Sequence, residues 1–171
     1  MMRESLSGTQ EIGLIALRTL IGWHFCYEGV FKLLRPAWSR AGAPLEAWSS
    51  AAYLRNATGP FADLFQSIGN SPWIGTLDLA LAIALVAIGL LLMLGLFTQA
   101  ACVGALVLLA LFYLSAVPLQ GVPEPRTEGA YLIVNKNLIE AAAVFVVLLF
   151  RTGTIAGLDR RRVVRREEVT T

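Results

Sequence analysis

The sequence is poor in the residues that hold metals and haem. It has one histidine and two cysteines among 171 residues. A structural zinc site takes four ligands, mostly cysteine and histidine, and a haem held by two histidines needs two of them, so the chain alone can form neither. A glycine-rich phosphate loop following a strand is also missing, which removes the usual nucleotide and flavin motifs. We therefore expect no haem, metal, flavin or nucleotide as a cofactor.

Charge is scarce as well, because only 15% of the residues are charged and 56% are hydrophobic. Soluble domains carry about a quarter charged residues. The apolar residues form long runs, and a helix of about 20 residues crosses a bilayer core of about 30 Å. The pattern predicts an all-α fold, an integral membrane four-helix transmembrane bundle. Its expected spans are about 12–34, 75–97, 100–117 and 131–150.

The arginines of the tail set the expected orientation. The basic tail 159–171 contains five arginines, and basic residues collect on the cytoplasmic side. Four spans then place both termini in the cytoplasm, in the cytoplasmic (inner) membrane. Segment 35–72 faces outward, and its aromatic residues favour an interfacial helical segment between the first two spans. The tail favours contact with anionic lipid over nucleic acid, so the lipid bilayer is an expected partner and nucleic acid is not.

Polar side chains in the first and last spans are expected at one depth. His24, Glu28 and Lys32 follow one another at intervals of four residues, which places them on one helix face. Lys136 and Glu140 have the same spacing and could pair within their own helix. A charge near the bilayer centre costs at least about 2.5–3.5 kcal/mol. We therefore expect a polar pocket inside the bundle, open toward the outer face under segment 35–72.

Such a pocket suits a quinone, whose ring carbonyls need hydrogen-bond donors and whose reduction needs protons. It also suits a small anion, because lysines lie near its mouth. The alternative is that these ion pairs and amides only hold the helices together. Candidate proton-transferring, catalytic residues are Glu28, His24, Glu140 and Tyr113. Candidate substrate-binding residues are Arg18, Lys32, Asn135, Lys136 and Asp78.

The two cysteines argue against a quinone-linked thiol oxidase. Cys26 is expected in the outer half of the first span and Cys102 near the inner end of the third. At 1.5 Å per residue they should lie about 15 Å apart along the membrane normal. A disulfide needs Cα atoms within about 7 Å, so we expect no bond between them.

Three stretches carry a resemblance to a known family. "YEGVFKL", "IVNKNLIE" and the closing "GLDR" resemble the DoxX/DoxD-like family of membrane proteins, over roughly residues 17 to 160. The resemblance implies a four-helix bundle and a subunit of thiosulfate:quinone oxidoreductase, which oxidises thiosulfate to tetrathionate and reduces quinone. It also implies a second subunit or a larger membrane complex, and some relatives act as non-catalytic assembly partners. On the family's recurrent polar positions fall Arg18, Glu28, Lys32, Asn135, Lys136 and Glu140.

Overall fold

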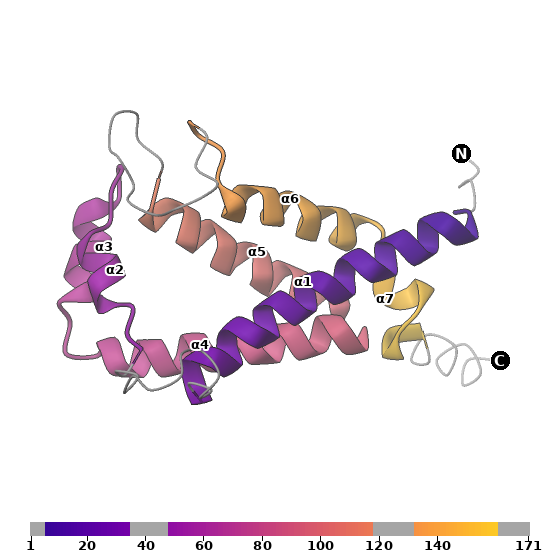
Figure 1. Ribbon diagram of the computed structural model, residues 1–171, viewed down its shortest axis with the longest axis horizontal. Coiled ribbons are helices and arrows are strands. Elements are labelled where there is room, and N and C mark those ends of the chain that lie inside the picture. Colours follow the sequence, from indigo (N-terminus) through magenta and orange to yellow (C-terminus); the bar gives the residue numbers. More distant parts are fainter. Residues whose placement is uncertain (1–5, 35–47, 118–131, 161–171) are drawn as a thin grey trace, which may run out of the picture.

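The computed structural model describes residues 6–34, 48–117 and 132–160 (Figure 1). Within these ranges every regular element is a helix. The expected all-α architecture is therefore confirmed there. The helices in chain order are α1 (Gly8–Leu34), α2 (Ala51–Arg55), α3 (Ala62–Gly69), α4 (Ile74–Leu94), α5 (Thr98–Ser115), α6 (Lys136–Leu149) and α7 (Thr152–Ile155).

Two of these helices, α4 and α5, are long and apolar enough to cross a membrane. Only 28% and 33% of their most apolar windows are buried inside the protein, whereas the core helix of a soluble protein is mostly buried. Gly95 ends α4 with a φ of 64°, a left-handed conformation that glycine adopts without steric cost. The charge-free runs of the sequence therefore fold as helices with apolar, outward-facing sides.

The last long helix is shorter than the sequence predicts. Asn135 has an extended backbone, and its side chain accepts a hydrogen bond from the Leu138 amide, so α6 begins at Lys136 rather than near 131. This is a typical N-cap, in which a polar side chain satisfies an amide that lacks a helical partner. A helix of 14 residues is about 21 Å long. The helix therefore begins later than the start of the expected span 131–150, whose bounds as a membrane span stay a prediction.

Glycines bring α1 and α4 into close contact. A Cβ atom on Gly22 would lie 2.9 Å from the Gly89 carbonyl oxygen, and one on Gly29 would lie 2.8 Å from the Ala82 carbonyl oxygen. A Cβ on Gly89 would collide with the amide of Cys26. Small residues let helix backbones approach in this way. At these glycines α1 therefore packs directly on the backbone of α4 and on the side chains of Val86 and Met93, with no room for a larger residue.

The other helices complete a bundle with distinct ends. Val144 and Val147 of α6 are buried against α5. The helices α2 and α3 lie across one end of the bundle, while α7 and the start of α1 lie at the opposite end (Figure 1). We call these the outer end and the inner end. Cys26 and Cys102 are free thiols.

Candidate functional site

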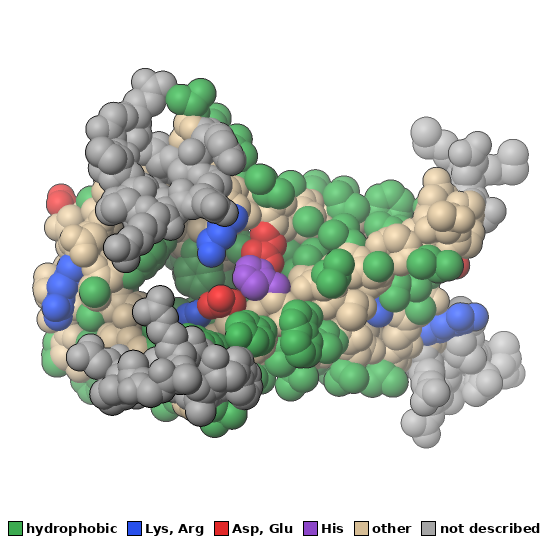
Figure 2. Space-filling model, in the orientation of Figure 1, with side chains coloured by type: hydrophobic (Ala, Val, Ile, Leu, Met, Phe, Trp, Pro, Cys, Tyr) green, Lys and Arg blue, Asp and Glu red, His purple; other side chains and the backbone are tan. Residues whose placement is uncertain are grey.

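A cavity of about 510 Å³ lies toward the outer end, among α1, α4, α5 and α6. Its wall is mostly apolar, and its rim carries the ionisable side chains of α1 and α6. Figure 2 shows the one histidine of the chain beside acidic and basic side chains at a hollow in the surface. The wall includes Phe25, Leu81, Leu85, Leu108, Leu109 and Phe112. The rim consists of His24, Glu28, Lys32, Lys136, Asn137 and Glu140.

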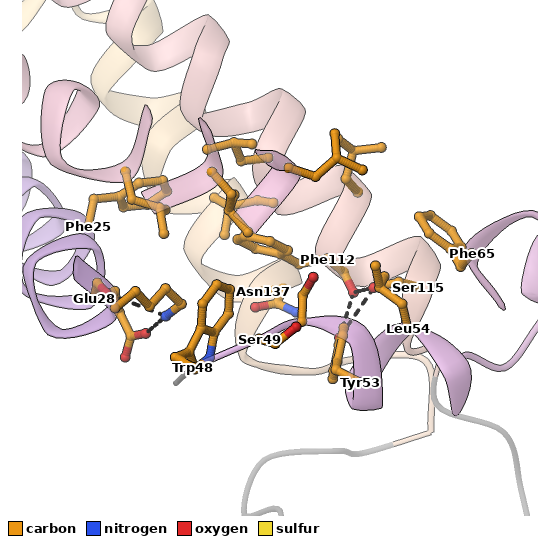
Figure 3. Close-up of a pocket in the computed structure, with 18 of the residues that line it drawn as sticks. Phe25, Glu28, Trp48, Ser49, Tyr53, Leu54, Phe65, Phe112, Ser115 and Asn137 are labelled. Atoms are coloured by element: carbon orange, nitrogen blue, oxygen red, sulfur yellow. Dashed lines mark hydrogen bonds and ion pairs between the residues drawn. The ribbon is translucent and has the colours of Figure 1, made fainter. Parts of the chain in front are cut away.

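The polar stripe of α1 faces the cavity along its length, since His24, Glu28 and Lys32 all line it. Glu28 and Lys32 form an ion pair within the helix. The Lys32 ammonium also lies 5.0 Å from the centre of the Trp48 ring, a cation–π contact. Figure 3 shows Glu28 and Trp48 on the same side of the cavity. The position of Lys32 is therefore fixed by one carboxylate and one aromatic ring.

The polar residues of α6 meet the stripe of α1 across the cavity mouth. His24 Nδ1 lies 2.6 Å from Glu140 Oε1. The sequence spacing predicts a pair between Lys136 and Glu140, but Glu140 instead pairs with His24, which lies at the same depth on the facing helix. Lys136 is exposed and lines the cavity without an ion-pair partner among the described residues.

Asp78, a predicted substrate-binding residue, does not line the cavity. Its carboxylate instead holds in place the segment before α2, which covers the cavity. Its carboxylate is 7% exposed. It accepts hydrogen bonds from the Ser49 hydroxyl at 2.7 Å, from the Ser50 amide at 3.1 Å and from the Ser50 hydroxyl. Ser49 and Ser50 themselves line the cavity. Asp78 therefore ties the chain before α2 to the start of α4.

The other end of α2 is tied to α5. The Tyr53 hydroxyl donates to the Phe112 carbonyl at 3.3 Å, and the Ser115 hydroxyl lies 3.3 Å from the Tyr53 hydroxyl (Figure 3). Phe65 and Ile68 of α3 also line the cavity. We call residues 48–54, together with Phe65 and Ile68, the roof. The expected opening toward the outer face is therefore covered by the described roof.

Two further predicted residues set the start of α6 and do not line the cavity. The Tyr113 hydroxyl donates to the Ile133 carbonyl at 2.7 Å. Asn135 caps the helix, as described above, and is 9% exposed. Both side chains are engaged with backbone groups in this structure. They position Lys136, Asn137 and Glu140, which do line the cavity.

Arg18 lies at the inner end and is remote from the cavity. It is 3% exposed, and its Nη1 donates to the Thr152 carbonyl at 2.8 Å. Six residues separate Arg18 from His24, about 9 Å along the helix and about 240° around it, so the two cannot share a face. Arg18 also interacts electrostatically with Asp159. Its surroundings fit the alternative of a residue that holds the bundle together.

Sequence reasoning missed the residues of the roof that line the cavity. Trp48, Ser49 and Ser50 lie far along the chain from α1 and from Asp78, and no spacing in the sequence links them. Asn137 was visible only as a second amide in an apolar segment. The polar residues of this segment indicated that α6 takes part in the site. In the roof, the aromatic residues gave the sole indication of this kind.

The arrangement can hold a small amphipathic molecule. The apolar wall can pack against a ring or chain, and the rim offers hydrogen-bond donors and acceptors. The His24–Glu140 pair can exchange a proton with a bound group because both side chains line the same space. Within the described residues, no three metal-ligating side chains gather. No protein-family model, curated protein or solved structure matched the chain.

Proposed function

We propose that the chain is a multi-pass protein of the cytoplasmic membrane in which α1, α4, α5 and α6 all cross the bilayer, with both termini in the cytoplasm. Large apolar side chains are exposed on all four helices, for example Leu20 at 67%, Ile83 at 53%, Val107 at 54% and Phe145 at 51%. Exposed apolar surface on every side of a bundle suits lipid better than water. The start of α1 and α7 lie at the same end, as an even number of crossings requires.

The short α6 is compatible with this proposal. Non-helical backbone is tolerated at membrane depth where it is buried in protein or lines a cavity. The chain before α6 meets this condition, since Asn135 is buried and the Ile133 carbonyl accepts the hydrogen bond from Tyr113. Four charged residues of α1 and α6 lie on the cavity, where they can remain hydrated or paired: Glu28, Lys32, Lys136 and Glu140.

Within this membrane frame the cavity binds a quinone, and the chain serves as the membrane subunit of a thiosulfate:quinone type of oxidoreductase. The observation that carries the proposal is the cavity itself, which joins apolar walls to a rim with two ion pairs. A quinone ring needs apolar walls and donors for its carbonyls. An apolar core with a few placed polar groups is typical of small-molecule sites.

The chemistry divides between bound molecules and the chain. Two thiosulfates form tetrathionate through a new sulfur–sulfur bond and release two electrons. The quinone takes up these two electrons and two protons to form a quinol. Glu28, His24 and Glu140 lie where they can pass protons to the ring oxygens. Lys136 supplies positive charge for the sulfur anion or for the charge that develops on the reduced ring.

The test is thiosulfate-dependent reduction of decylubiquinone by membrane vesicles that carry the protein and its partner subunit. We expect Glu28→Gln to stop turnover while the protein remains folded, because the amide cannot carry a proton. Glu11→Gln is the matched control, since Glu11 lies on the same helix and does not line the cavity. Unchanged turnover in Glu28→Gln would remove this residue from the mechanism. Absence of turnover in the parent vesicles would remove the enzymatic proposal.

A second candidate is a non-catalytic subunit that assembles a larger membrane complex. The observation that favours it is the pair of His24 and Glu140, which joins α1 to α6 as a packing contact would. On this alternative, filling the cavity should be harmless. Leu109→Trp, which adds volume to a buried cavity wall residue, would then leave the activity of the complex intact. On the quinone proposal the same variant loses quinone reduction.

A further inference from the structure

The cavity is closed by described residues on three of its sides. At the outer end the roof is tied to α4 through Asp78 and to α5 through Tyr53. Between α1 and α4 the glycine contacts leave no passage. Between α5 and α6, which are in contact, the buried valines of α6 belong to the same hydrophobic cluster as Ala105 and Leu109. Among the described helices two seams remain, that between α4 and α5 and that between α1 and α6, and the α1–α6 seam is the less closely packed of the two.

This seam is loosely closed. α1 packs much less closely on α6 than on α4. Among the described residues, a single polar contact joins α1 to α6, the pair of His24 and Glu140 at 2.6 Å. The side chains of His24 and Glu28 remain 45% and 42% exposed although both line the cavity. Leu77 of α4 and Leu111 of α5 also line the cavity and are 47% and 45% exposed. His24 and Glu28 differ from them in being polar, so these two mark a mouth that suits a polar head group.

An aromatic row on α1 runs beside this mouth. The ring centres of Trp23 and Tyr27 lie 6.4 Å apart, and those of Tyr27 and Phe31 lie 6.3 Å apart. Each of these residues directly precedes a member of the polar stripe, so the two rows are neighbours on the helix. Trp23 and Tyr27 are 59% and 41% exposed. A hydrocarbon chain that leaves the mouth would find an apolar surface next to it.

We propose that the cavity is filled sideways through the α1–α6 seam, by a single-chain amphiphile dissolved in the bilayer, and that the His24–Glu140 pair is the latch of this entrance. The inference rests on the proposed membrane function and adds to it the route and the required hydrocarbon chain. The polar head of the amphiphile sits inside the rim, and its chain lies along the row of Trp23, Tyr27 and Phe31. The latch must part for the head to pass.

The experiment cross-links the seam and follows entry by fluorescence. The variant carries His24→Cys and Glu140→Cys in a background with Cys26→Ala and Cys102→Ala, and keeps Trp48 as the only tryptophan. It is reconstituted in phosphatidylcholine vesicles and treated with a short bifunctional thiosulfonate. Decylubiquinone, which quenches tryptophan fluorescence, is the probe, and the same quinone ring without its decyl chain is the comparison.

We expect the cross-linked protein to lose the fast quenching of Trp48 by decylubiquinone, and reductant to restore it in the same sample. The single variants His24→Cys and Glu140→Cys, given the same reagent, should quench as before treatment. The ring without a chain should quench weakly even in the open protein. If the tryptophan-reduced protein does not fold, the cysteine pair is placed in a background with all four tryptophans, and bound probe is extracted and counted.

The outcomes separate the two proposals. Unchanged quenching after confirmed cross-linking, or equal quenching by the two quinones, would overturn sideways entry while leaving the cavity as a quinone site. Absence of quenching in the open protein would overturn both the entrance and the site. Loss of quenching that reductant restores would support the entrance and its latch.

Discussion

The two seams of α1 are built in opposite ways. Toward α4, the helix presents Gly22 to Gly89 and Gly29 to Ala82 and Val86, and the backbones touch. Toward α6, it presents histidine, glutamate and lysine, and the helices are joined there by one side-chain pair. One helix therefore serves as part of the rigid frame on one side and as the edge of a cavity on the other. The difference teaches that polar residues in a largely apolar helix can mark the side on which it packs less closely.

The close contacts of the α1–α4 seam are followed at the inner end by further contacts that stabilise the fold. Arg18 of α1 binds a backbone carbonyl beside α7, and Asp159 accepts hydrogen bonds from the amides of Phe97 and Thr98 at 2.8 and 2.9 Å. There both charged side chains hydrogen-bond to backbone groups. On the rim of the cavity the charged side chains of α1 pair with other side chains. The charges at the inner end therefore stabilise the fold, whereas those on the rim lie where a ligand can reach them.

The largest effect is expected where the closed seam is overfilled. Gly89→Ala should lower the free energy of unfolding by about 1–3 kcal/mol, because its new methyl group meets the backbone of α1. Gly75→Ala is the matched control in the same helix, where a Cβ meets nothing within 4 Å. The control should keep or raise stability, since alanine is the better helix former. Unfolding in a series of sodium dodecyl sulfate concentrations measures both, and equal behaviour would contradict the closed seam.

A smaller loss is expected at the inner end. Asp159→Ala should cost about 1–2 kcal/mol, because two amides at the start of α5 lose their acceptor. Asp63→Ala, at an exposed carboxylate in the first turn of α3, is the control and should change the unfolding midpoint less. If Asp63→Ala lost as much free energy of unfolding as Asp159→Ala, the hydrogen bonds of Asp159 would have no specific stabilising role.

The open seam should matter less for stability. The double variant His24→Leu with Glu140→Leu removes both partners and leaves no orphan charge, so its free energy of unfolding should stay within about 1 kcal/mol of the parent. The single variant His24→Leu should be less stable than the double variant, because Glu140 then loses its partner. The comparison uses the same detergent unfolding. A double variant as unstable as Gly89→Ala would mean that the two seams support the fold equally.

The smallest effect is expected at the edge of the roof. Trp48→Leu removes the ring that lies over Lys32 and should cost about 0.5 kcal/mol. Trp73→Leu, at a residue 70% exposed and outside the cavity, serves as the control. Thermal unfolding should barely separate the two variants, whereas binding of decylubiquinone should weaken only in Trp48→Leu. Equal binding by both would remove Trp48 from the site.

The helices were predictable from the sequence because length and apolarity decide them. The charge-free runs 79–97 and 100–117 correspond closely to α4 and α5. The run 131–150 misled at its start, because hydropathy averages over a window and does not register that Asn135 is a cap. The all-α architecture was thus accessible, whereas the crossing of four helices through a bilayer stays a proposal.

The site was predictable in part, for a reason of geometry. The spacing of His24, Glu28 and Lys32 fixes one helix face whatever the neighbours do, and the structure places all three on the cavity. The partner of Glu140 depends on how α1 and α6 dock, which spacing within one helix cannot reveal. No residue near Asp78 in the sequence indicates that its partners are Ser49 and Ser50. Long-range contacts of this kind depend on the assembled fold.

The cap that Asp159 provides has a consequence for biosynthesis. The amide of Phe97 finds its acceptor 62 residues later in the chain, and no side chain at the start of α5 substitutes for it. During translation α5 must therefore form with these amides still uncapped. The hydrogen bonds that cap its start can form only after residue 159 has left the ribosome. A nascent chain stopped before that point exposes a feature by which quality control could tell unfinished protein from finished protein.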